Sequence, residues 1–104
     1  MNRMIYITED IRSTSGSNQK DDSLVKRITD DIIYLNLISK DPIHILLDTD
    51  GGNLKTALTI YDILLSSRAP VYTYGLSEVS SAGVLIYIAW KKRFAFKHTQ
   101  FMTH

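Results

Sequence analysis

The chain contains no cysteine among its 104 residues, which excludes structural disulfides and thiolate metal sites. Its longest unbroken apolar run, Val84 to Trp90, is far shorter than the roughly 20 residues that a membrane-spanning helix needs. The net charge of +1 gives no excess of either sign that would favour nucleic acid or an acidic surface as a partner. Glu9 and Asp10 place acidic groups too early for a signal peptide. We therefore expect a cytoplasmic protein with no nucleic-acid or membrane partner.

The composition favours a single domain. An apolar content of 44% over 104 residues suffices for one compact unit, residues 1–104, with a modest core. The stretch at about 11–21 is rich in serine, glycine and asparagine, and it is predicted as an exposed polar loop within that unit.

Segments typical of strands alternate along the chain with segments of helical periodicity. Strands are expected at 4–8, 43–47, 70–74, 93–96 and 101–104, and helices at about 23–39, 54–67 and 81–91. The strand at 43–47 reads IHILL, and its nearly continuous apolar character predicts burial on both faces. The second helix is expected to bury Leu54, Ala57, Ile60, Tyr61 and Leu64. The alternation predicts an α/β fold with a mainly parallel sheet and right-handed crossovers.

Two glycine-bearing turns, DTDGGN and SEVSSAG, follow two of the predicted strands. Functional sites of parallel α/β sheets collect where the carboxyl ends of strands meet helix N-termini. Ser81 would stand at such a helix N-terminus, where backbone N–H groups and the helix dipole favour an oxyanion. A serine at this position, whether Ser80 or Ser81, can also act simply as an N-cap. Spacing alone favours the capping role.

A nucleophilic serine needs a neighbouring base, and the chain offers three histidines. His44 lies within an apolar strand, as is typical of a structural residue. His98 is expected in an exposed turn, and His104 follows a strand-like segment at the end of the chain. Spacing does not choose among them. Asp48 and Asp50 form only a weak magnesium signal, because paired carboxylates in a turn are more often solvated turn formers.

Three segments resemble, in the same order, the proteolytic subunit of the Clp protease. They are IHILLDTDGGNLKTALTIYDIL, APVYTYGLSEVSSAGVLIYIA and KRFAFKHTQFMTH. The resemblance is strong over about residues 43–104 and looser from Met4 onward. It implies a ClpP/crotonase-like α/β fold, with a mainly parallel sheet and ββα units, that is incomplete at the C-terminus.

The resemblance also implies an activity, namely a serine endopeptidase that hydrolyses peptide bonds in unfolded proteins. Ser81 takes the place of the nucleophile, because it alone is followed by x-Gly, and His104 takes that of the general base. The N–H groups of Gly52 and Ala82 fall at the oxyanion hole. The edge that would pair with a substrate peptide consists of Gly52, Asn53 and Leu54. No cofactor and no metal are implied.

Partners and departures follow from the same resemblance. It implies a homo-oligomer or related subunits, together with a separate AAA+ ATPase that unfolds substrates. The family's triad aspartate follows the histidine motif, so we expect this chain to be a fragment that is inactive by itself. Asp50 replaces the family's usual proline, and its carboxylate opposes the charge of an oxyanion. The alternative is a non-catalytic ClpP-like structural or interaction module.

Overall fold

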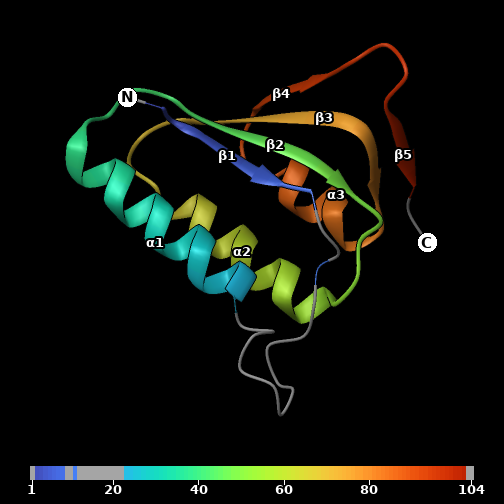
Figure 1. The fold of residues 1–104 in the computed structure, drawn as a ribbon, viewed down its shortest axis with the longest axis horizontal. Helices are drawn as coiled ribbons and strands as arrows, with labels where there is room; N and C mark the ends of the chain where they lie inside the picture. Colours follow the sequence, from blue (N-terminus) through green and yellow to red (C-terminus); the bar gives the residue numbers. More distant parts are fainter. Residues whose placement is uncertain (1, 9–10, 12–22, 103–104) are drawn as a thin grey trace.

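A computed structural model describes residues 2–8, 11 and 23–102. Within these residues, the strands are Met4–Ile7 (β1), Ile43–Thr49 (β2), Val71–Ser80 (β3), Lys92–Ala95 (β4) and Gln100–Met102 (β5). The helices are Ser23–Ile38 (α1), Leu54–Leu65 (α2) and Ala82–Tyr87 (α3), as Figure 1 shows. None of the helices in the described ranges is long and apolar enough to cross a membrane.

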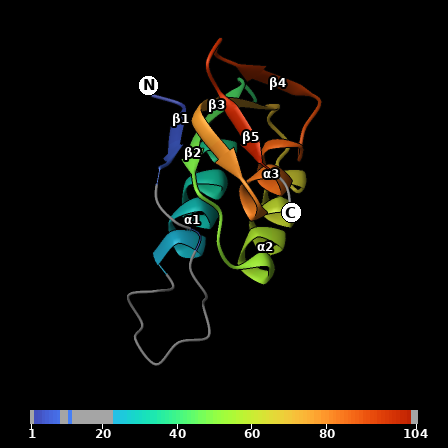
Figure 2. The same ribbon diagram turned by 90° about the vertical axis from the view of Figure 1, so that its right-hand side faces the viewer.

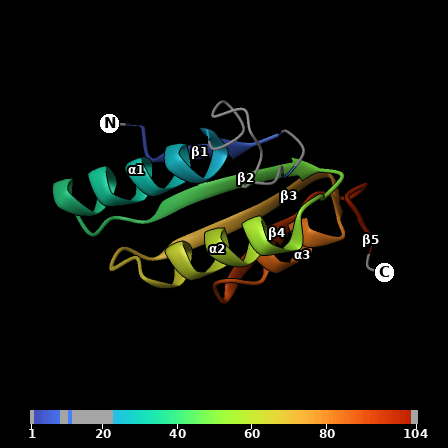
Figure 3. The same ribbon diagram turned by 90° about the horizontal axis from the view of Figure 1, so that it is seen from below.

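All the strands pair in parallel in one sheet. The order is β1-β2-β3-β4, and β5 pairs with the far end of β3. Because the strand order advances in one direction, right-handed crossovers place every helix on the same side. The three helices accordingly lie together on one face of the sheet (Figure 2, Figure 3). The predicted α/β class with a mainly parallel sheet is confirmed.

The expectation that β2 is covered on both faces is wrong. Burial alternates along β2, with Ile43, Ile45 and Leu47 buried and the residues between them partly exposed. A doubly covered sheet needs a reversal in strand order, and this sheet has none. The open face carries aromatic rings instead, including Tyr74 and Phe94, whose stacked ring centroids are 5.0 Å apart.

The core lies between the sheet and the helix layer as a single cluster. The predicted stripe of α1 is buried, and it consists of Leu24, Ile28, Ile32 and Leu35. In α2 the buried residues are Thr56, Ala57, Ile60 and Leu64. The expectation for Leu54 is wrong, because the buried stripe begins at Thr56 and leaves Leu54 58% exposed at the helix end. Tyr61 is only partly buried.

Three predicted boundaries also change. The strand expected at 70–74 continues to Ser80, because β5 pairs with residues 78–80 and supplies the ladder there. The helix expected at 81–91 is Ala82–Tyr87. Ile11, which was placed in the exposed loop, is buried and pairs with Gly52. The rest of that predicted loop lies outside the described residues.

The exposed apolar side chains of β4, of β5 and of the turn between them predict self-association. Phe94, Phe96, Phe101 and Met102 are 46%, 62%, 44% and 51% exposed. We expect light scattering at micromolar concentration to report dimers or larger species. Phe96→Ser is expected to weaken association about tenfold or more, since a buried phenylalanine contributes roughly 1.5–3 kcal/mol.

The control for this prediction is Leu37→Ser, which removes an apolar side chain that is 81% exposed on α1. This variant should associate like the parent chain. A parent chain that remains monomeric, or equal effects of the two substitutions, would contradict the prediction.

Candidate active site

The turn between β2 and α2 is built on glycine backbone. Gly51 and Gly52 have φ angles of 97° and 140°, which residues with a Cβ rarely adopt. A Cβ on Gly52 would lie 2.0 Å from the carbonyl oxygen of Ile11. Asn53 then caps α2, and its Oδ1 accepts a hydrogen bond from the Thr56 N–H at 2.8 Å. The sequence Gly-Gly-Asn thus turns the chain sharply and starts the helix.

Ser81 joins β3 to α3 in a strained conformation. Its φ of 53° and ψ of −120° make it the single non-glycine residue with positive φ in the described ranges. Such a conformation costs on the order of 1–3 kcal/mol and persists only where the surrounding structure imposes it. The Ser81 N–H donates to the Met102 carbonyl at 2.6 Å, which ties the turn to β5. A serine on a sharp strand-to-helix turn has the geometry of a nucleophile elbow.

The capping role that spacing favoured for Ser81 is wrong. Its side chain makes no capping hydrogen bond to α3. The predicted position of Ser81 at the start of the third helix is confirmed, since α3 begins at the next residue. The Ser81 side chain is half-buried and therefore open to a reactant on one side.

The two turns meet at the carboxyl end of the sheet (Figure 1). A Cβ on Gly51 would lie 2.8 Å from the Ser81 Cβ and 3.2 Å from the Ala82 nitrogen. Ala82 is the first residue of α3, where N–H groups have no acceptor within their own helix. A Cβ on Gly83 would lie 2.6 Å from Thr49 Cγ2. Small residues on both turns are what permit this close approach.

The backbone of Gly52 faces away from Ile11. The Ile11 N–H donates to the Gly51 carbonyl at 2.8 Å, and the Asn53 N–H donates to the Ile11 carbonyl at 2.7 Å. In such a parallel bridge, the residue between the two partners directs its own N–H and C=O to the opposite side. Gly52 therefore directs both groups to the side open to an added strand. Leu54 is already the first residue of α2, so only its N–H lacks an acceptor within the helix.

Asn53 does not fit the substrate-pairing role expected for it. Its N–H is bonded to Ile11, and its carbonyl accepts the Ala57 N–H at 3.1 Å. Its side chain caps α2. Both backbone groups and the side-chain oxygen of Asn53 are thus engaged in forming the turn, which leaves Gly52 and the Leu54 N–H from the predicted edge.

The three histidines have separate locations. His44 Nδ1 lies 2.7 Å from the Tyr74 hydroxyl on the open face, which confirms its structural interpretation. His98 is exposed in the turn between β4 and β5, as predicted. His104 lies outside the described residues. The last described residue is Met102, whose carbonyl accepts the hydrogen bond from the Ser81 N–H.

Carboxylates near the site are engaged with other groups. Ser80 is buried, and its hydroxyl donates to the Glu78 carboxylate at 2.5 Å. Glu78 is therefore engaged with the serine that precedes Ser81. The Glu78 N–H donates to Asp48 Oδ1 at 3.2 Å, so the Asp48 carboxylate links β2 to β3. The described residues contain no group of three or more His, Asp or Glu side chains that could hold a metal ion.

The bond between Ser80 and Glu78 predicts a measurable coupling. Glu78→Ala leaves a buried hydroxyl without its acceptor and should lower the free energy of unfolding by about 1–3 kcal/mol. In a Ser80→Ala background the same change should cost about 1 kcal/mol less. Urea unfolding of the four proteins measures the coupling, with the exposed Asp62→Ala as a control. Additive effects of Glu78→Ala and Ser80→Ala would contradict this contact.

Two contributors to the site were missed from the sequence, Gly51 and Met102. A pair of glycines after a strand signals that both residues need unusual backbone space, and this signal was available for Gly51. Met102 contributes its backbone carbonyl, so its side-chain identity carries no signal.

Comparison with known proteins identifies one family. The Clp protease family matches residues 3–104. ATP-dependent Clp protease proteolytic subunit 2 of Treponema pallidum is 34% identical over 93 residues, which cover 86% of this chain and 46% of the relative. The corresponding subunit of Paracoccus denitrificans is 33% identical over 85 residues, covering 80% and 43%. This chain spans about half the length of the curated relatives it matches.

Solved structures give the same result for the fold. ClpP1 from Listeria monocytogenes has a TM-score of 0.83 at 30% identity, covering 96% of this chain and 55% of that one. The ClpP protease catalytic domain from Plasmodium falciparum has a TM-score of 0.82 at 26% identity, covering 98% and 53%. The ClpP-like fold expected from the sequence is confirmed.

Proposed function

The chain belongs to the Clp protease family, and from this premise we propose that it carries the nucleophile of a serine peptidase active site. The observation that carries the proposal is the conformation of Ser81. Its positive φ places a half-buried serine at the tip of a strand-to-helix turn. Backbone strain is concentrated at functional sites, and neither capping nor burial accounts for it here.

The chemistry we propose is acyl transfer to Ser81. The Ser81 Oγ attacks a peptide carbonyl, and the resulting oxyanion accepts hydrogen bonds from the Gly52 and Ala82 N–H groups. His104 takes the proton of the attacking hydroxyl and passes it to the leaving amine. Water then hydrolyses the acyl-enzyme. The close approach of Gly51 to Ser81 and Ala82 supports this assignment, because it brings the turn that contains Gly52 against the turn that contains Ala82.

Chain connectivity supports His104 as the base. His104 follows Met102 by two residues, and two residues of chain span at most about 7 Å. The Met102 carbonyl is 2.6 Å from the Ser81 nitrogen. His44 and His98 lack a comparable link to this turn.

An extended peptide is the substrate that fits the remaining edge. We propose that it pairs with the Gly52 carbonyl and with the Leu54 N–H, which has no acceptor within α2 because Leu54 is the first helical residue, while the Gly52 N–H serves the oxyanion. The substrates of the whole protein would be unfolded polypeptides. Its subunits would form an oligomer and receive substrates from a separate ATPase, as expected for the family.

The 104-residue chain alone is expected to hydrolyse peptides poorly. Its curated relatives are about twice as long. The resemblance to the Clp proteolytic subunit implies that the acid that orients the histidine follows the histidine motif, in the half that this chain does not match. Replacing that acid in a serine protease lowers turnover about 10⁴-fold. Losing one wall of the cleft also removes contacts that hold the scissile bond in line.

Complementation tests the proposal. The chain is mixed with a fragment of the Treponema pallidum relative that carries the remainder of the domain, and hydrolysis of a fluorogenic peptide is measured. We expect the mixture to exceed either part by about 100-fold or more, given the 10⁴-fold contribution of the acid. A fragment with its triad aspartate replaced by alanine is the control. Circular dichroism and size exclusion establish that the parts fold and combine. A combined but inactive mixture would contradict the proposal and favour the non-catalytic module.

A further inference from the structure

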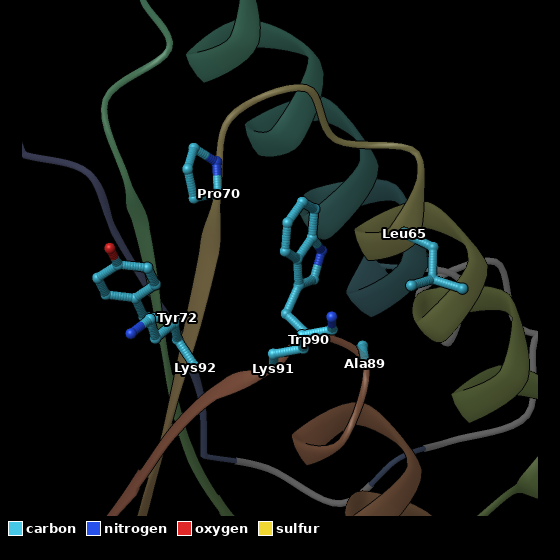
Figure 4. A pocket seen from close by; sticks show the side chains of 7 residues that line it. All are labelled: Leu65, Pro70, Tyr72, Ala89, Trp90, Lys91 and Lys92. Atoms are coloured by element: carbon cyan, nitrogen blue, oxygen red, sulfur yellow. The ribbon is translucent and has the colours of Figure 1, made fainter.

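A cavity of about 650 Å³ lies beside the start of β3 (Figure 4). The residues that line it are Leu65, Pro70, Tyr72, Ala89, Trp90, Lys91 and Lys92. Pro70 and Tyr72 are at the start of β3, and Ser81 follows its end, so about 30 Å of extended strand separates the two regions. The volume is within the range of small-molecule sites, roughly 300–1,000 Å³. The cavity is therefore separate from the proposed peptidase site.

Apolar groups form the wall of this cavity. The indole of Trp90 lies between Pro70 and Leu65, and the Tyr72 ring lies across β3 from it (Figure 4). Its Nε1 donates to the Leu64 carbonyl at 2.6 Å, which holds the ring in place. The Arg93 side chain also donates to the Trp90 carbonyl at 2.9 Å, so the backbone is held as well. The wall is thus largely pre-formed, which reduces the entropy lost on binding.

Positive charge accompanies the apolar wall. Lys91 and Lys92 line the cavity and are exposed, and no carboxylate is among its lining residues. Lys92 is the register partner of Tyr72, whose ring lies on the open face of the sheet near those of His44 and Phe94. A lysine ammonium is a compact, mobile charge suited to a single anionic group. A ligand complementary to both features has an apolar body and a negative end.

We propose that this cavity binds a small alkyl carboxylate of the fatty-acid type. The alkyl chain packs on Trp90, Pro70 and Leu65, and the carboxylate lies at Lys91 and Lys92. A neutral apolar molecule lacks a partner for the two charges, and a highly charged phosphate compound lacks an apolar part for the wall. The binding requires no covalent step and is independent of the function proposed for Ser81.

Trp90 makes the proposal directly testable, because it is the only tryptophan of the chain. The chain is titrated with octanoate, decanoate and 1-octanol below their aggregation limits while tryptophan fluorescence is recorded. We expect saturable changes, with about fourfold tighter binding for each added methylene. Octanol should bind about three- to tenfold more weakly than octanoate, as expected for two exposed ion pairs. That difference should shrink at high salt.

Charge variants locate the binding. Lys91→Gln with Lys92→Gln should abolish the preference for octanoate over octanol, whereas Lys40→Gln with Lys97→Gln, two exposed lysines outside the cavity, should preserve it. Leu65→Ala should weaken both ligands, and its side chain is exposed enough for the fold to tolerate the change. Unsaturable fluorescence, equal binding of the acid and the alcohol, or an unchanged preference in the Lys91 and Lys92 variant would each overturn the proposal.

Discussion

Ser81→Ala should reduce peptide hydrolysis by the complemented protein to background, whereas Ser80→Ala should retain most of it. The two serines are adjacent, but Ser80 is buried and bonded to Glu78, and Ser81 has the strained turn conformation. Loss of the nucleophile in a serine protease costs on the order of 10⁶-fold in turnover. Ser80→Ala removes a hydroxyl of the same size, so it controls for changes in packing and stability.

The base should behave as a unit with the nucleophile. His104→Ala is expected to lower turnover by a comparable factor, and the double variant with Ser81→Ala should be no worse than either single variant. Initial rates are measured for all the variants at a saturating concentration of the complementing fragment, and each rate is normalised to the amount of complex formed. Activity that survives Ser81→Ala, or that disappears with Ser80→Ala while the protein stays folded, would contradict the assignment.

Gly52→Ala is expected to destabilise the chain by about 3 kcal/mol or more. The new Cβ would lie 2.0 Å from the Ile11 carbonyl oxygen, and φ at this position is 140°. Backbone strain of about 1–3 kcal/mol and overpacking of about 1–3 kcal/mol act together here. Because the contacting atoms belong to the backbone, no side chain can rotate to relieve the clash. For a domain of this size, the midpoint temperature should fall by about 12 °C or more.

Gly75→Ala is the matched control for Gly52→Ala. Its Cβ would meet the Thr99 and Phe101 side chains at 3.0 and 3.2 Å, and these are able to shift. We expect a loss of only about 1 kcal/mol for this substitution. Thermal unfolding followed by circular dichroism compares the two variants. Equal midpoints would show that the turn at Gly52 yields more easily than its geometry indicates.

The sequence predicted the fold well because its signals are local. The alternation of strand and helix patterns, and the buried stripe of α1, depend on residues near one another in the chain. The length of β3 depends instead on β5, which pairs with residues 78–80 from about 20 residues further along. The open face of β2 depends on the order of all the strands. Neither feature leaves a local signal, and both expectations failed.

For the candidate site, too, features that depend on local sequence were predicted, and features that depend on distant elements were not. The position of Ser81 before α3 followed from the motif, but its positive φ arises where β3, β5 and the glycine turn meet. Asn53 was expected to pair with substrate, yet it is the residue that caps α2 and bonds to Ile11. The sequence separates Ser81 from Ser80 only through the family motif. The hydrogen bond from Ser80 to Glu78 adds a physical difference between the two serines.

The most direct measurement is to map the residue that reacts with a fluorophosphonate. The reagent forms a covalent adduct with an activated serine, so mass spectrometry of the digested protein identifies the nucleophile without reference to substrate choice. In the complemented protein we predict an adduct on Ser81, none on Ser80, and none in the Ser81→Ala variant. An adduct on another residue, or labelling that persists undiminished after Ser81→Ala, would contradict the central claim.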